Sequence, residues 1–498
     1  MNKFIHHPAA MWVMLGMIIL THLPFMSEPP RSIHVWRQSI TLSMARNLSE
    51  EGMNILEPRV DRRMDTEGIT GSQFLSYEYI LATLYKLFGE NENYSRWLSL
   101  FFYLLIAAGM YHLLLQLNLK PGIALCGAWL MAFSPELFYH GINAIPDILA
   151  LATSVWGLYF FFQWQQQTIQ TKWLVLSLAC ISISGLTKLQ YLATGVPIAV
   201  LFIRGMIRRE YTRGMILTAF YTGFMGILSC LAWYLYAHSL IQASGLKDIG
   251  IVFQPETDWK RGMQILTRNL ISDLPELLLG YVGLLGFGMG IWVAFRRKLY
   301  RHTLFLPVLI WVLVLIAYHL IELRQMGVHQ YYMLPYLPLL FLIVAIGMRS
   351  IAPARPWIIA LLLLLSSMLA FNRIVPARWV DGQEGILLSF YKPETRRQLE
   401  NLVPHTTRVI TGPDKSGCIN FYFTHKKGFC FEQTGEAFSL TWNGMTLIDD
   451  AIARGARVAY LTSPDEFNDP RWIPYISKEL FRNEEVWVFE LPPAGKNY

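Results

Sequence analysis

A series of apolar segments, each close to the length needed to cross a lipid bilayer, dominates the sequence. A transmembrane helix needs about 20 consecutive, mostly apolar residues. Charged residues make up only 15% of the 498 residues, whereas about 25% is usual for a soluble domain. The predicted spans are 9–26, 96–117, 122–140, 146–165, 172–187, 190–205, 214–238, 272–295, 303–322, 330–348 and 356–373. The pattern predicts a polytopic α-helical membrane protein with about 11 transmembrane helices.

Two of these predictions involve a choice. The segments 172–187 and 190–205 meet at Lys188, and they form either two short spans or one broken segment. The first span, 9–26, is followed by a long polar stretch without a small-residue cleavage site, so we expect a retained helix rather than a signal peptide.

Lysine and arginine residues set the expected orientation, because cytoplasmic loops carry an excess of them. One set of short loops holds Arg204, Arg208, Arg209, Arg213, Arg296, Arg297, Lys298, Arg301, Arg349 and Arg355. The opposite turns, 141–145 and 323–329, hold only Arg324. The N-terminus is therefore predicted to be cytoplasmic, and an odd number of spans places the C-terminus outside. These loops also explain the net charge of +7, so the charge does not require a nucleic acid partner.

Two long polar regions lie on the predicted outer side. The first is the loop 27–95, which we include in a transmembrane domain at 1–375, and the second is 376–498. In the second region, strand-like runs and one helix-like run occur at Arg408–Thr411, Ala456–Leu461, Val486–Leu491 and, for the helix, Leu447–Arg454. A helix, a glycine and a strand in succession are typical of α/β structure. We therefore predict a C-terminal extracytoplasmic α/β domain.

The five cysteines fall into two groups. Cys126, Cys180 and Cys230 lie inside predicted spans and are expected to pack there. Cys418 and Cys430 lie in the outer domain, where an oxidising compartment allows a disulfide. Two free buried thiols are the alternative, because the distance between the two residues does not follow from sequence.

A carboxylate lies at the outer start of the fourth predicted span, where a charge is costly and usually functional. Asp147 follows Pro146, and Glu136, His140 and Asn143 precede it within a short stretch. Asp147 either caps the helix at the positive end of its dipole or belongs to a site at the outer membrane edge.

Basic and aromatic side chains are predicted to lie at the same edge. Lys188 either extends its ammonium to the interface or binds a phosphate there. His329 precedes the pair Tyr331 and Tyr332 at the start of the tenth span, in a position where tyrosines often form an interfacial belt. Together these residues suit a lipid-linked substrate whose tail remains in the bilayer.

The first outer loop adds His34, Arg37 and Gln38, a combination that can hold phosphate and sugar hydroxyls. The sequence contains no phosphate-binding glycine motif and no zinc-binding spacing of cysteine and histidine. A soluble nucleotide substrate is therefore not expected.

These motifs, in this order, resemble those of the C-class integral-membrane glycosyltransferases (GT-C). The resemblance is strongest to the bacterial branch related to protein O-mannosyltransferases and lipid A aminoarabinose transferases, and it covers nearly the whole chain. It is carried by His34–Gln38, Ala45–Asn47, Tyr85–Gly89, Ser134–Pro135, Pro146–Asp147, Gly185–Lys188, Trp233–Tyr234, Tyr331–Pro335 and Pro338. The resemblance is specific to the superfamily and not to a substrate.

The resemblance implies an enzyme that transfers a hexose or pentose from undecaprenyl phosphate to a lipid, glycan or protein acceptor. The reaction would take place at the outer face of the bacterial cytoplasmic membrane, by inverting displacement at the anomeric carbon. Asp147 and His34 are the expected catalytic residues. The expected ligands of the donor and its phosphate are Arg37, Gln38, Lys188, His329, Tyr331 and Tyr332. No metal ligand is predicted, and the resemblance leaves open whether a divalent metal is required.

The sequence departs from the family pattern in the first outer loop. Ile40 stands where relatives have an acid that activates the acceptor hydroxyl, and Gln73 replaces a second acid. The candidates that remain for this role are Glu28, Glu57, Asp61, His34 and Asp147. The departure also keeps a non-catalytic binder of lipid-linked sugars open, and a transporter or flippase of such lipids is a separate alternative.

Overall fold

The structure, a computed structural model, describes residues 9–166, 170–246, 255–351, 356–380, 387–442 and 444–494. Tertiary contacts divide the chain into two units, each formed by three segments. The helical unit consists of Met1–Ser27, Asn93–Tyr236 and Ile251–Val380. The α/β unit consists of Glu28–Glu92, Ala237–Gly250 and Asp381–Tyr498.

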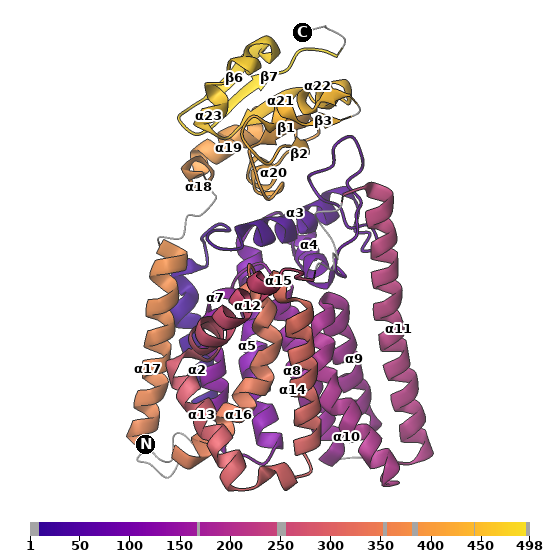
Figure 1. Cartoon of the computed structure of the whole chain (residues 1–498), viewed down its shortest axis with the longest axis vertical. Coiled ribbons are helices and arrows are strands. Elements are labelled where there is room, and N and C mark those ends of the chain that lie inside the picture. Colours follow the sequence, from indigo (N-terminus) through magenta and orange to yellow (C-terminus); the bar gives the residue numbers. More distant parts are fainter. Residues whose placement is uncertain are drawn as a thin grey trace. The chain divides into compact units, whose positions relative to one another are not determined.

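Each predicted apolar segment is largely helical, but the segment 122–140 forms two helices that are separated at Phe133 and Ser134 (Figure 1). The helices are α2 (Ala9–His22), α5 (Asn93–Gln116), α6 (Pro121–Ala132), α7 (Pro135–His140), α8 (Asp147–Gln166), α9 (Thr171–Thr187), α10 (Gly195–Ile207), α11 (Arg213–Ser244), α13 (Gly280–Arg296), α14 (Phe305–Ile321), α16 (Leu337–Ile351) and α17 (Pro356–Ile374). Six helical segments of the described chain are long and apolar enough to cross a membrane. The prediction of a multi-pass helical membrane protein is therefore confirmed, whereas the number of crossings stays a prediction.

Short helices link several of these spans. They are η1 (Leu23–Phe25), η2 (Leu189–Thr194), α12 (Trp259–Arg268), η3 (Asn269–Leu279), η4 (Leu299–Arg301), α15 (Leu323–Met326), η5 (Gln330–Tyr336) and η6 (Val375–Val380). Between α9 and η2 the chain is extended at Lys188, with φ −156° and ψ 115°. The sequence break at this lysine is therefore also a break between two helices.

Glycines allow α13 and α16 to pack at close range. A Cβ atom on Gly290 would lie 2.1 Å from the carbonyl oxygen of Ile343, and one on Gly347 would lie 2.0 Å from that of Gly286. Small residues at such positions let two membrane helices approach closely, because dispersion contacts rather than the hydrophobic effect hold helices together in lipid. Larger residues at these two positions would force the helices apart.

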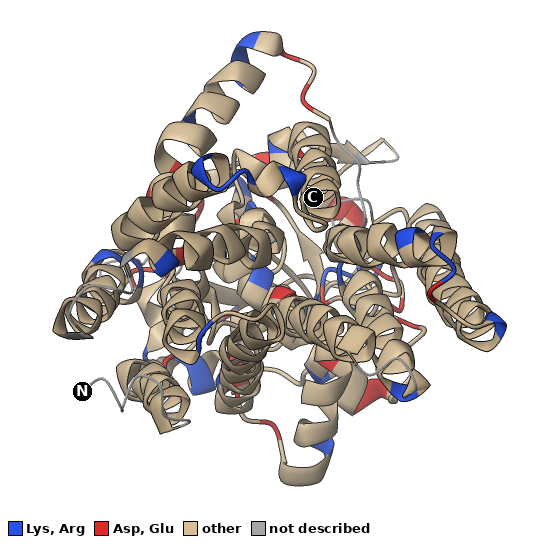
Figure 2. Ribbon diagram, turned by 90° about the horizontal axis from the view of Figure 1, so that it is seen from below, with Lys and Arg blue, Asp and Glu red and all other residues tan. Residues whose placement is uncertain are grey.

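Basic residues gather where α10 meets α11 and where α13 meets α14. Arg204 near the end of α10 donates from Nη1 to the carbonyl oxygen of Thr303, 2.8 Å away, so the two connections lie side by side. Figure 2 shows the molecule from below, and several Lys and Arg residues are visible at helix ends. The cytoplasmic loops predicted from charge thus include two that are neighbours in space.

The α/β unit contains a five-stranded sheet in the order β2-β1-β5-β7-β6. Its strands are β1 (Arg408–Gly412), β2 (Lys427–Cys430), β5 (Val458–Leu461), β6 (Lys478–Arg482) and β7 (Trp487–Glu490). Strand β1 pairs in parallel with β2 and β5, and β7 pairs antiparallel with β5 and β6. Strands β1, β5 and β7 are nearly or fully buried and alternate little in polarity, as is usual for strands covered on both faces.

Helices and a hairpin complete the C-terminal part of this unit. They are α18 (Leu388–Tyr391), α19 (Pro393–Asn401), α20 (Ile419–Thr424), α21 (Glu436–Ser439), α22 (Leu447–Ala453), α23 (Pro464–Phe467), η7 (Pro470–Tyr475), β3 (Thr441–Trp442) and β4 (Met445–Thr446). A cluster that includes Ile410, Phe429, Ile448, Trp472 and Phe489 forms the core. The predicted α/β character of this region is confirmed.

The first predicted outer loop packs against the same sheet. It contains α3 (Val35–Glu51) and α4 (Ser76–Phe88). The backbone of Gly428 in β2 donates to the carbonyl oxygen of Asp61 over 3.1 Å and accepts from the amide of Arg63 over 3.1 Å. The loop thereby pairs with β2, the edge strand of the sheet. Backbone groups of β2 that would otherwise be unpaired are satisfied in this way.

Cys418 and Cys430 are both buried, and they are not bonded to each other. The Cys418 thiol lies 3.5 Å from the carbonyl oxygen of Trp36, and the Cys430 thiol lies 3.7 Å from that of Asp414. Burial raises the pKa of both thiols well above the ordinary value. Of the two alternatives, the structure has two free buried thiols.

Candidate active site

Asp147 and Lys188 meet because α8 and α9 form an antiparallel pair (Figure 1). Asp147 is the first residue of α8, and Lys188 directly follows the last residue of α9. The Lys188 ammonium lies 3.3 Å from the Asp147 carboxylate, whose side chain is fully buried. An ammonium is therefore held at a fixed place, which is what binding of a single phosphate requires.

Two aromatic rings of η5 lie under the Lys188 ammonium. Its Nζ atom is 5.2 Å from the centre of the Tyr331 ring and 4.9 Å from that of Tyr332. The His329 ring lies 5.6 Å and 5.8 Å from the same two rings. Such cation–π contacts attract the ammonium to the faces of the two rings. Five of the predicted site residues, Asp147, Lys188, His329, Tyr331 and Tyr332, thus lie together in the helical unit.

A second buried polar cluster lies on α7. His140 Nε2 is 3.0 Å from one oxygen of Glu136, and Arg378 Nη1 is 3.6 Å from the other. The Arg378 guanidinium also lies 4.6 Å above the centre of the Tyr139 ring. The His140 ring contacts Tyr331 edge to face, with 5.6 Å between the ring centres. Tyr331 therefore contacts both this cluster and Lys188.

Asn143 has a structural role in the turn between α7 and α8. Its side-chain oxygen accepts from Arg96 Nη1 over 3.2 Å, and its carbonyl oxygen accepts from the Ser99 hydroxyl over 2.8 Å. Both donors belong to α5. These bonds fix the start of α8 and with it the position of Asp147.

An apolar groove of about 600 Å³ lies between α9, α10 and α11. Its lining includes Leu178, Phe202, Met206, Phe220 and Ile227, and Ser182 is the one polar side chain among the described lining residues. The groove also reaches Leu192, one helical turn after Lys188 in the chain. Such a groove can hold a long hydrocarbon chain but offers nothing to a polar ligand.

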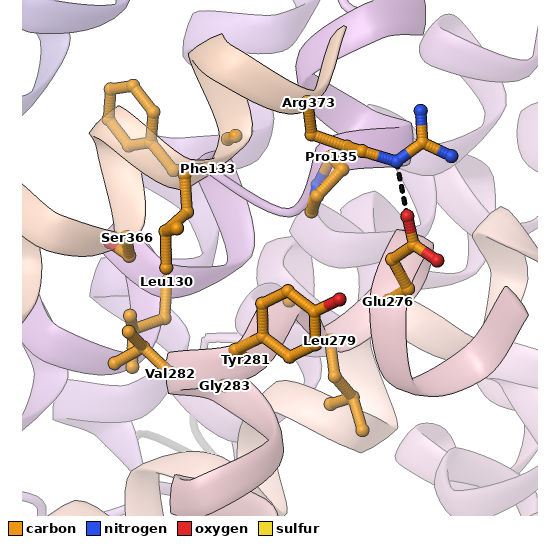
Figure 3. Close-up of a pocket in the computed structure, with 13 residues that line it drawn as sticks. Leu130, Phe133, Pro135, Glu276, Leu279, Tyr281, Val282, Gly283, Ser366 and Arg373 are labelled. Atoms are coloured by element: carbon orange, nitrogen blue, oxygen red, sulfur yellow. Dashed lines mark hydrogen bonds and ion pairs between the residues drawn. The ribbon is translucent and has the colours of Figure 1, made fainter. Parts of the chain in front are cut away.

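A much smaller pocket between α6, α13 and α17 is shown in Figure 3. Leu130, Phe133 and Tyr281 line it, and an ion pair of Glu276 with Arg373 lies at its edge. Its volume of about 20 Å³ is close to that of one water molecule. This pocket is therefore too small for a sugar.

In the α/β unit, the three predicted residues of the first loop lie at the start of α3. His34 precedes the helix with φ +64°, and Arg37 and Gln38 occupy its first turn, buried. Gln38 donates to the carbonyl oxygen of Arg31 over 3.3 Å. The Nε and Nη2 atoms of Arg37 are buried and have no hydrogen-bond partner in the described part of the chain. A buried guanidinium with open donors is suited to an anion.

The acids of the first loop that could replace the one missing at Ile40 are held by basic side chains. Asp61 is buried, 3.1 Å from Arg46 Nη2 and 2.8 Å from Asn47 Nδ2. Glu57 and Glu28 form ion pairs with Arg59 and Arg31 over 2.9 Å and 2.7 Å, respectively. Ile40 itself is buried.

Arg378 and Glu78 are among the buried charged residues that sequence analysis did not single out. Arg378 lies in η6, just beyond the last predicted span, and no local pattern connects it with α7. Glu78 is fully buried in the first turn of α4, and one of its oxygens accepts from Gln73 Nε2 over 2.9 Å. The replacement of an acid by Gln73 could have drawn attention to the acid five residues later.

One group of described side chains is close enough to share a metal ion, namely Glu50, Glu90 and His425. His425 Nε2 lies 2.9 Å from Glu50, while Lys427 lies 3.4 Å from Glu50 and Arg46 lies 3.9 Å from Glu90. Two basic side chains thus already compensate the charge of these carboxylates.

Comparison with known proteins shows which proteins this chain is similar to in sequence and in fold. Residues 64–241, which include Asp147 and Lys188, match the family described as dolichyl-phosphate-mannose-protein mannosyltransferase. No curated protein sequence matches the chain. ArnT from Cupriavidus metallidurans matches in the apo state with a TM-score of 0.64 at 13% identity, over 99% of this chain and 100% of that one. The same protein bound to undecaprenyl phosphate gives 0.64 at 12% identity, again over 99% and 100%.

The oligosaccharyltransferase of Archaeoglobus fulgidus, in complex with Zn and sulfate, also matches. Its TM-score is 0.55 at 11% identity, over 91% of this chain and 68% of that one. At these identities the structural matches establish the fold: the chain shares the fold of ArnT and of the oligosaccharyltransferase, as the predicted resemblance implies. Together with the family match, the fold supports a glycosyltransferase and disfavours the transporter and binder alternatives.

Proposed function

We propose that the protein transfers a sugar from a polyprenyl phosphate, in bacteria undecaprenyl phosphate, to an acceptor hydroxyl. The observation that carries the proposal is the Lys188 ammonium, which lies 3.3 Å from Asp147 and belongs to a residue four positions before Leu192 in the lining of the apolar groove. A charge beside an apolar groove matches a ligand that has a phosphate head and a hydrocarbon tail. The family match covers this part of the chain and supports the same donor class.

In this proposal the phosphate binds Lys188 and the prenyl chain lies between α10 and α11. As the bond between the anomeric carbon and the phosphate oxygen breaks, negative charge grows on the phosphate, and the ammonium stabilises it. Asp147 fixes the lysine and orients the acceptor. Arg37, Gln38 and His34 of the first loop are further proposed ligands of the sugar phosphate, and His329, Tyr331 and Tyr332 complete the set.

The reaction is proposed to take place at the outer face of the bacterial cytoplasmic membrane. The basic loops of the helical unit would then be cytoplasmic, and both 27–95 and 376–498 extracytoplasmic. The site is compatible with a hexose or a pentose as the transferred sugar. It is also compatible with a lipid, a glycan or a protein as the acceptor.

A radiolabel assay tests the proposal. Purified protein in detergent is given a panel of undecaprenyl phosphate sugars and acceptors, and the release of polyprenyl phosphate is measured. We expect release with at least one donor, and its loss in Asp147→Asn. Folded wild-type protein that releases nothing from any donor would contradict the proposal and favour the transporter or binder.

A further inference from the structure

The pair Glu136 and His140 on α7 has no part in the donor binding proposed above. The two residues are four positions apart and therefore share a helix face. Their side chains are 0% and 1% exposed, and 3.0 Å separates His140 Nε2 from Glu136 Oε1. Arg378 approaches the same carboxylate to 3.6 Å. Charged groups buried in a membrane domain are costly and usually functional.

Transfer to a hydroxyl group requires a group that accepts the hydroxyl proton. The carboxylate of Asp147 is paired with Lys188. The candidate acids of the first loop are also paired with basic side chains: Glu28 with Arg31, Glu57 with Arg59, and Asp61 with Arg46. A proton bound by any of these carboxylates would weaken an ion pair. An imidazole beside a carboxylate gains stability when it takes up a proton.

His140 is also close to the proposed phosphate site. Its ring centre lies 5.6 Å from that of Tyr331, and the Lys188 ammonium lies 5.2 Å from the same ring. A single aromatic side chain thus connects the imidazole with the ammonium. A carboxylate that holds an imidazole in one orientation and stabilises its protonated form is a recurring general-base arrangement.

We infer that His140 is the general base of the transfer and that Glu136 positions its imidazole. This inference rests on the proposed function. The acceptor oxygen forms a bond to the anomeric carbon, while the bond from that carbon to the phosphate oxygen breaks and its electron pair remains on the phosphate. The hydroxyl proton moves to His140, which faces one oxygen of Glu136 while Arg378 approaches the other, and the proton then passes to water.

Chemical rescue tests the assignment. In His140→Ala, kcat should fall by about a hundredfold or more, with little change in the donor KM, and added imidazole should restore part of the lost rate. Glu136→Gln should also lower kcat, but imidazole should have little effect on it, because His140 is still present. A histidine with a purely structural role would not be rescued.

Two further variants make the result specific. His22 is a buried histidine that contacts the carbonyl oxygen of Phe138 in α7 over 2.9 Å, so His22→Asn disturbs the same helix and should keep kcat and show no rescue. Glu78→Gln tests the competing buried carboxylate of the α/β unit.

The inference is overturned if folded His140→Ala keeps the wild-type kcat, or if it loses kcat and imidazole restores none of it. An inactive Glu78→Gln beside an active His140→Ala would assign the base to α4. A wild-type protein inactive with every donor would instead refute the proposed function, and the inference with it.

Discussion

Lys188 and Asp147 form an ion pair inside a membrane domain, where each charge alone would be unfavourable. Their attraction offsets part of the desolvation penalty, and the two tyrosines below the ammonium contribute further. Stability alone does not explain the presence of this pair, because a buried ion pair is often no more stabilising than two apolar residues in the same place. Its retention fits a role in binding phosphate.

Substitution of either partner should separate two roles. We expect Asp147→Asn to reduce transfer by about a hundredfold or more without loss of folded protein. Lys188→Ala should raise the donor KM more than the acceptor KM, because only the donor carries the phosphate. Steady-state kinetics with each substrate varied in turn measure both effects. Wild-type activity in Asp147→Asn at normal yield, or an unchanged donor KM in Lys188→Ala, would contradict these roles.

Asp61 is expected to matter for stability and not for chemistry. Asp61→Asn removes the closer of the two carboxylates that pair with the buried Arg46, since Asp61 lies 3.1 Å away and is almost fully buried, whereas Glu90 lies 3.9 Å away and is exposed. Loss of one member of a buried pair costs about 3–5 kcal/mol. Limited proteolysis should show a less stable α/β unit, while the folded fraction keeps its kcat. A stable variant without activity would instead show that the Asp61 carboxylate is the catalytic base.

At the scale of elements, α11 diverges enough from α9 and α10 to leave the apolar groove. It approaches α9 near Gly226, where a Cβ atom would lie 1.9 Å from the Ser182 hydroxyl. Tyr234, ten residues before the end of α11, donates to the carbonyl oxygen of Gly185 over 3.2 Å, and Gly185 lies three residues before Lys188. These contacts hold α11 against the part of α9 that precedes Lys188 in the sequence, and they therefore fix that end of the groove.

The groove can be filled without strain at Gly223. A Cβ atom there meets nothing within 4 Å, and the residue lines the groove. We expect Gly223→Phe to raise the KM for undecaprenyl phosphate donors several-fold, because its ring occupies space needed by the prenyl chain. The KM for donors with a two-isoprene chain should change little.

Gly288→Phe is the matched control for this experiment. A Cβ atom on Gly288 also meets nothing within 4 Å, and this residue is not among those lining the groove. An equal effect of both substitutions, or of Gly223→Phe on long and short donors, would show that the groove does not hold the prenyl chain.

At the scale of the whole molecule, carboxylates of the first loop tie α3 to β2. Burial would raise the pKa of Glu50 and Glu51, but a hydrogen bond from His425 and the charges of His425, Lys427 and Arg46 together outweigh it at Glu50. At Glu51 the hydrogen bonds and charges of Arg63 and Lys427 do the same. Both pKa values are lowered to about 2 from an ordinary value of 4.5. A carboxyl group with a lowered pKa in the folded state adds stability above its unfolded pKa.

The α/β unit should therefore lose stability as the pH falls from about 4.5 to about 2, because protonation removes these contacts. Cleavage by pepsin, which is active in this range, should accelerate over the same interval. Lys427→Met should reduce the dependence on pH and increase cleavage at the upper end. A cleavage rate that stays constant between pH 5 and pH 2 would show that these pairs do not hold the loop.

Much of the fold follows from the sequence alone, because the signals are local. The length of each apolar segment predicts a membrane helix whatever its neighbours are, and each predicted segment is largely helical. The strands at 408–412 and 458–461 also follow from short apolar runs between a glycine and a helix. The proximity of Asp147 and Lys188 follows in part, since two consecutive antiparallel helices bring their outer ends together.

The remaining features depend on helices that are distant in the chain. Arg378 lies 3.6 Å from Glu136 only because α17 and its extension η6 pack beside α7. The carboxylate of Asp61 looked like a candidate acid until the structure placed Arg46 against it. The sequence gives the charge of each side chain, but tertiary packing determines which opposite charge lies next to it. An ion pair forms wherever the fold brings opposite charges within about 4 Å. The sequence thus determined the membrane spans and the kinds of side chain at the site. Tertiary packing decided which of those side chains are available to a substrate, because it sets which charged groups pair with each other.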